Sequence, residues 1–167
     1  MILTTHGVVG ATTAVFLASN PAFGLVAAFG SHFVLDSFPH WDYSIQSLRK
    51  EVGNPVGGEF VLGPGSLVDF LKIGLDFSCG LVLPIILLTL SVPSVEGLWL
   101  ILGGALAGML PDFLQFIYIR FKFPWLLPVQ KFHDWAHTKT KIKYRPLRGA
   151  FLQMIVVIAV ISIFYYS

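Results

Sequence analysis

Long apolar runs dominate this chain and limit what it can fold into. Separated by Pro and Gly breakers, they predict helices at 5–19, 21–38, 66–92, 96–121 and 147–166. A helix that crosses a hydrocarbon core of about 30 Å needs roughly 20 apolar residues. Soluble domains rarely combine 55% hydrophobic with only 12% charged residues. We therefore predict an all-α, polytopic transmembrane helix bundle of about five helices, with residues 1–167 forming a single integral membrane domain.

The first two predicted helices are short for a membrane crossing. Asn20-Pro21 separates them, so we expect residues 5–19 and 21–38 to form a tight hairpin that is tilted or partly re-entrant. The sequence before the first run carries no Lys or Arg, which argues against a cleaved signal peptide. Cys79 is the only cysteine, so neither an intrachain disulfide nor a Cys-based zinc site is expected.

Basic residues are confined to one set of connections. If successive helices cross in alternate directions, residues 1–5, 39–65 and 122–146 lie on one side. All 11 lysines and arginines fall in or beside these segments. The positive-inside rule predicts that this side is cytoplasmic. We therefore expect the connections that carry the basic residues to lie at the cytoplasmic face.

The histidines and several aspartates fall on the same predicted side. His32 and Asp36 are one helical turn apart and share a face, and Pro39 ends the helix so that the following polar residues can turn inward. Asp112 follows Gly104 and Gly108 at intervals of four, a small-residue stripe typical of close helix packing. The residues predicted to bind metal are His6, His32, Asp36, His40, Asp112, His133 and His137.

Two shorter patterns allow more than one interpretation. The segment Phe132–His137 predicts a short interfacial helix and reads H-D-x-x-H, close to the H-E-x-x-H of zinc proteases. Asp69, Lys72 and Asp76 are spaced so that the lysine can pair with both acids. A neutralised charge cluster explains these three residues as well as a functional role does.

The same residues can be explained without a metal. His32 and Asp36 alone would fit a hydrogen-bonded pair between helices, and Asp112 would fit a salt bridge with Arg120. Histidine mixed with carboxylate suits zinc best, and manganese also fits. Seven candidate ligands exceed the four that one zinc ion needs, so we predict a divalent metal cofactor of one or two ions.

Together these motifs resemble the bacterial inner-membrane metal-dependent hydrolases of the LexA-regulated type, which are similar in character to zinc-dependent phospholipase C-like enzymes. The resemblance covers most of the chain. It rests on Thr5-His6, on Asp36, Pro39, His40 and Asp42, on Pro111-Asp112, and on the late pair His133 and His137. It implies a protein of the prokaryotic inner membrane with its active site on the cytoplasmic side. It implies hydrolysis more than it implies a substrate.

We expect hydrolysis of a phosphoester of a lipid or lipid-linked substrate at the cytoplasmic face, with Asp42 or Asp134 as the catalytic general base. Membrane lipid with anionic head groups is the expected partner, attracted by the basic last loop. No nucleic acid partner is expected, and a homodimer through the small-residue stripes stays open.

Two other functions fit part of the pattern. A membrane zinc metalloprotease would use His133, Asp134 and His137. A metal-ion transporter or a metal-stabilised scaffold would use the same ligands without hydrolysis. Transport requires polar groups along a path through the membrane. On the opposite predicted side Glu96 is the only acidic or basic residue, which argues against a transport path.

Overall fold

The computed structural model describes residues 1–50, 56, 58–138 and 146–166, which form six α-helices and one small hairpin. The helices are α1 (Leu3–Phe16), α2 (Pro21–Ser37), α3 (Ser66–Leu88), α4 (Val95–Phe121), α5 (Leu127–Ala136) and α6 (Pro146–Tyr166). Strands β1 (Leu48–Lys50) and β2 (Gly58–Phe60) are antiparallel, with Arg49 opposite Glu59. The all-α class is confirmed. The hairpin was not predicted from the sequence.

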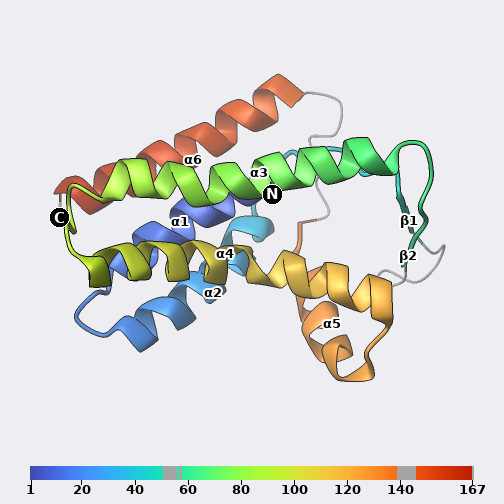
Figure 1. Ribbon diagram of the computed structural model, residues 1–167, viewed down its shortest axis with the longest axis horizontal. Coiled ribbons are helices and arrows are strands. Elements are labelled where there is room, and N and C mark those ends of the chain that lie inside the picture. Colours follow the sequence, from blue (N-terminus) through green and yellow to red (C-terminus); the bar gives the residue numbers. More distant parts are fainter. Residues whose placement is uncertain (51–55, 57, 139–145, 167) are drawn as a thin grey trace.

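Helix α1 lies in the middle of the bundle and packs against α2, α3, α4 and α6 (Figure 1). The α1–α2 turn, the α3–α4 turn and the end of α6 gather at one end, while α5 and the β-hairpin lie towards the other (Figure 1). Helices α3, α4 and α6 are long and apolar enough to cross a membrane. With 14 and 17 residues, α1 and α2 are only about 21 and 26 Å long, short of a full crossing.

Glycines allow the neighbouring helices to approach α1 closely. A Cβ at Gly108 of α4 would overlap the His6 carbonyl oxygen, and a Cβ at Gly104 would lie 2.9 Å from Ala11 Cα. On the α1 side, a Cβ at Gly10 would lie 2.9 Å from Gly108 Cα. The predicted small-residue stripe of α4 is therefore confirmed as a packing surface. Because it is filled within one chain, a homodimer would need another surface.

Asp76 of α3 caps the first turn of α1. Its side-chain oxygens accept hydrogen bonds from Leu3 N at 2.8 Å, Thr4 N at 2.9 Å and Thr4 Oγ1 at 2.6 Å. The residue before the helix, Ile2, offers no side-chain cap. Helix N–H groups that lack a partner are costly inside a protein, so Asp76 fixes where α1 begins.

Asp69, the other acid near the start of α3, anchors the segment before β1. It accepts hydrogen bonds from Ser47 N and Ser47 Oγ, both at 2.7 Å. Lys72 Nζ lies 3.8 Å from Asp69 Oδ1. The charged residues of α3 thus have structural partners, which favours the structural interpretation of this cluster over a functional one.

We expect Asp76→Ala to lower the free energy of unfolding by about 2 kcal/mol, as is typical of a lost N-cap with charge-assisted hydrogen bonds. Thermal unfolding in detergent, followed by circular dichroism, measures the effect. Lys72→Ala is the control, because its partly exposed ion pair contributes no more than about 1 kcal/mol. Equal destabilisation by the two variants would argue against the capping role of Asp76.

Candidate metal centre

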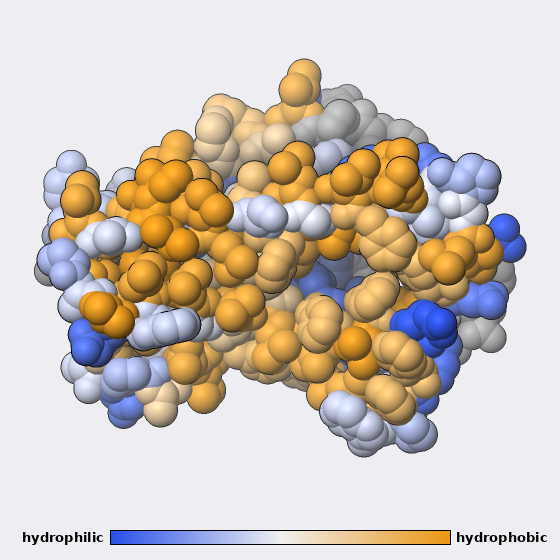
Figure 2. Space-filling view, in the orientation of Figure 1, coloured by the Kyte–Doolittle hydropathy of each residue, from blue (hydrophilic) through white to orange (hydrophobic). Residues whose placement is uncertain are grey.

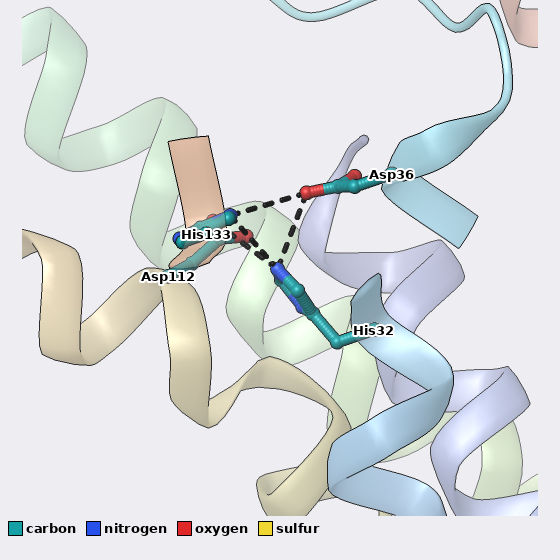
Figure 3. Close-up of side chains that lie close together, drawn as sticks. All are labelled: His32, Asp36, Asp112 and His133. Carbon is teal, nitrogen blue, oxygen red and sulfur yellow. Dashed lines mark hydrogen bonds and ion pairs between the residues drawn. The ribbon is translucent and has the colours of Figure 1, made fainter. Parts of the chain in front are cut away.

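Four ligand atoms from three helices converge beside α1: His32 and Asp36 of α2, Asp112 of α4 and His133 of α5 (Figure 3). His32 Nε2 lies 3.2 Å from both His133 Nε2 and Asp36 Oδ2. His133 Nε2 lies 3.3 Å from Asp36 Oδ2, and Asp112 Oδ1 lies 3.8 Å from both histidine nitrogens. Side chains far apart in the sequence therefore point at one spot.

These separations suit a divalent metal. Four donors held at zinc–ligand distances of about 2.0–2.1 Å in a tetrahedron lie roughly 3.3 Å from one another. The five separations given above run from 3.2 to 3.8 Å. Two imidazole nitrogens and two carboxylate oxygens also form a donor set that zinc and manganese accept. The residues fit the predicted cofactor.

A hydrogen bond from Nδ1 orients the ring of His32 so that Nε2 faces the cluster. Nδ1–H donates to the Gly108 carbonyl oxygen at 2.8 Å. A neutral imidazole carries one N–H, so Nε2 is then an acceptor that faces the acceptor Asp36 Oδ2. A cation between them makes this arrangement favourable, and a backbone carbonyl on the remote ring nitrogen is the usual support of a metal-binding histidine.

A second group shares Asp36 with the first. His40 and His137 complete it, with His40 Nε2 3.9 Å from Asp36 Oδ1 and His137 Nε2 3.7 Å from Asp36 Oδ2. His40 Nδ1–H donates to Phe38 O at 2.8 Å, so Nε2 faces inward here as well. The Met1 amino group also lies at this side, 2.7 Å from Asp36 Oδ1. Asp36 is the residue on which both groups depend.

His6 joins the centre from α1. Its ring stacks on His32 with centroids 3.9 Å apart, and Nε2 lies 3.2 Å from Asp36 Oδ1. His6 is fully buried, yet neither of its ring nitrogens has an aligned hydrogen-bond partner within the part of the chain that the structure describes. Buried polar atoms are almost always paired. The structure thus brings all seven predicted ligands together.

The two candidate general bases lie in different places. Asp42 Oδ1 lies 3.1 Å from His40 Nε2, and the Asp42 side chain is 30% exposed. Asp134 lies on the exposed side of α5, whereas its neighbour His133 is buried. His137 comes after the last residue of α5 with an extended backbone. His137 N–H still donates to the His133 carbonyl oxygen, and both Nε2 atoms lie near Asp36 Oδ2, at 3.3 and 3.7 Å. The acid between them differs from the Glu of H-E-x-x-H, because Asp134 is exposed and does not accompany His133 into the buried cluster.

Two polar residues near the centre, Gln153 and Tyr43, were not predicted from the sequence. Gln153 of α6 accepts hydrogen bonds from Ile2 N at 3.1 Å and Thr5 Oγ1 at 3.2 Å, and donates to Trp41 O at 2.9 Å. A glutamine within an apolar helix was the available signal. Tyr43 lies outside the long helices. Burial and the nearby Asp76 carboxylate raise the pKa of its hydroxyl, which therefore stays protonated.

The centre is recessed from the end of the bundle. Asp112 lies nine residues before the last residue of α4, Phe121, which corresponds to about 13 Å of helix. Comparison of the chain with protein-family models, curated proteins and solved structures found no match. The family resemblance of the motifs stays a prediction.

Proposed function

We propose that this membrane protein is a metal-dependent hydrolase that cleaves a phosphoester of a lipid or lipid-linked substrate at the cytoplasmic face. The observation that carries the proposal is the convergence of His32, Asp36, Asp112 and His133 at separations that a zinc ion requires. The resemblance of the motifs to those of LexA-regulated inner-membrane hydrolases supports the same type of reaction.

The residues have distinct proposed roles. His32, Asp36, Asp112 and His133 would hold one zinc ion, and Asp36 with His40 and His137 would hold a second. Manganese is the alternative metal. When bound, the metal polarises a phosphoryl oxygen and makes water a stronger nucleophile at neutral pH. Asp42 lies beside these ligands and is partly exposed, so it is the proposed acceptor of the proton that the attacking water loses.

The surface beside the centre supports a lipid substrate. Figure 2 shows a hollow between α3 and α4 with hydrophilic residues at its floor and hydrophobic residues around it. The exposed apolar side chains on these helices include Leu71, Leu75, Leu110 and Phe113. Acyl chains can lie against such side chains at little cost while a polar head group enters the hollow. A soluble substrate without acyl chains would gain no binding energy from these apolar side chains.

The test combines metal content with hydrolysis. We expect the protein purified in detergent to contain about one or two zinc ions per chain and to release a phosphorylated head group, or inorganic phosphate, from a phospholipid panel. His133→Ala should lower the rate by at least about 100-fold, because loss of even an outer-shell partner costs 10–100-fold. Asp134→Ala, one residue along on the exposed face, should leave the rate unchanged.

Three results would contradict the proposal. In the first, the wild-type protein binds no metal and a chelator does not change its thermal stability. The cluster would then be a hydrogen-bonded contact between helices. Cleavage of peptides without cleavage of phosphoesters would indicate the metalloprotease. Metal uptake into sealed vesicles without hydrolysis would indicate the transporter.

A further inference from the structure

A cavity lies beyond the candidate metal centre, between the β-hairpin and the end of α4. Its volume is about 570 Å³, and its lining carries three basic side chains, Arg49, Arg120 and Lys122, against one acid, Glu59. Pockets of 300–1,000 Å³ are the usual size for small ligands. The excess of positive charge favours an anion as the ligand. None of these residues belongs to the candidate metal centre.

The walls of this cavity are fixed by contacts within the fold. The ring of Phe60 on β2 packs against Phe70 of α3 and Phe116 of α4, with centroids 5.6 and 5.7 Å apart. Arg49 and Glu59 face each other across the hairpin, so the acid is placed to offset one of the three basic residues. Arg120 and Lys122 are left to attract a ligand.

Lys122 adopts an unusual backbone conformation at this cavity. Its φ is 56°, the only positive φ of a non-glycine residue among the described residues, and it directly follows α4. Glycine is the usual residue at such a position because a side chain makes the left-handed region costly. The Lys122 ammonium group donates to the Gly58 carbonyl oxygen on β2. The conformation thus brings a positive charge to the cavity and joins α4 to the hairpin.

Aromatic residues next to the cavity indicate its depth in the membrane. Phe121, Phe123 and Trp125 stack in sequence, with ring centroids 5.6 and 6.0 Å apart, and all three are exposed. Exposed aromatic side chains at helix ends typically lie at the level of the lipid head groups. Arg120 and Lys122 are therefore positioned where the phosphates of the membrane lie.

We propose that this cavity binds the phosphate ester of an anionic lipid head group. Arginine is suited to the ligand because its guanidinium group can donate two parallel hydrogen bonds to one phosphate. Arg120 follows Asp112 by eight residues on α4, so the phosphate lies about 12 Å farther along the helix than the metal centre. The cavity holds a lipid beside the centre and is a separate site from it.

The experiment measures lipid binding to the full chain by native mass spectrometry from detergent. Phosphatidylglycerol is the anionic probe, phosphatidylcholine the neutral one and glycerol phosphate the soluble one. We expect phosphatidylglycerol to bind more tightly than phosphatidylcholine. Arg120→Gln should weaken phosphatidylglycerol binding about fivefold, as expected for roughly 1 kcal/mol per basic residue near an anionic surface. Arg120→Lys should retain most of the affinity.

Lys131→Gln is the matched control, because it removes an exposed positive charge of α5 that does not line the cavity. Equal weakening by Arg120→Gln and Lys131→Gln, or equal binding of the two phospholipids, would overturn the proposal. Glycerol phosphate that binds as tightly as the lipid, with the same dependence on Arg120, would identify a soluble ester as the ligand and overturn the lipid assignment. Metal content should be unchanged in Arg120→Gln, so failure here is separable from failure of the hydrolase proposal.

Discussion

Asp36→Asn is expected to abolish metal binding at both ligand groups of the candidate metal centre, because Asp36 belongs to each of them. One oxygen of Asp36 lies 3.2–3.3 Å from His32 and His133, and the other lies 3.2 Å from His6. The substitution keeps the size of the side chain but removes the negative charge that both groups share. We expect metal affinity to fall by at least about 100-fold, more than the 10–100-fold typical of outer-shell substitutions.

Elemental analysis of the purified protein, before and after dialysis against a chelator, measures this change. Asp134→Asn is the control, because it removes an exposed carboxylate from α5 without touching the cluster. Circular dichroism should show a similar helix content in both variants. A full complement of metal in Asp36→Asn would show that Asp36 is not a shared ligand.

Gly108→Ala is expected to force α1 and α4 apart and to destabilise the protein. The new Cβ would overlap the His6 carbonyl oxygen and lie 3.1 Å from Gly10 Cα. Backbone atoms cannot rotate away as side chains do, so α1 and α4 must separate. Overpacking of this kind costs about 1–3 kcal/mol. Because the Gly108 carbonyl oxygen also holds His32, we expect metal affinity to fall with stability.

Gly30→Ala provides the matched comparison within a helix. No atom would lie within 4 Å of a Cβ at Gly30 of α2, so alanine should be neutral or should stabilise the helix by up to about 1 kcal/mol. Melting temperature and metal content should be measured for both variants. The close contact between α1 and α4 would be disproved if Gly108→Ala melted at the same temperature as Gly30→Ala.

Much of the fold was predictable because lipid imposes a simple rule on sequence. Apolar runs between breakers predicted α2 as 21–38 and α4 as 96–121, within one residue of the observed ends. The hairpin of Leu48–Lys50 and Gly58–Phe60 was not predictable. Strands of three residues are too short for an alternating pattern, and these are held by Phe60 packing on the helices.

The residues that gather in the candidate metal centre were predictable, but their arrangement was not. Charged and polar residues are costly near lipid. Histidines that gather on one predicted side therefore indicated a common ligand. The stacking of His6 on His32 depends on how closely α1 and α4 approach. The position of His137 depends on where α5 ends. Packing and chain ends of this kind leave no local pattern in the sequence.

The enclosure of α1 has a consequence for biogenesis. Among the described helices α1 emerges first from the ribosome, yet the surfaces that surround it belong to α2, α3, α4 and α6. At 14 residues it is too short to be held by the bilayer alone. The surfaces that enclose α1 therefore become available only as the later helices are made, and the cluster around His6 can form only after α4 and α5, which carry Asp112 and His133, have been added.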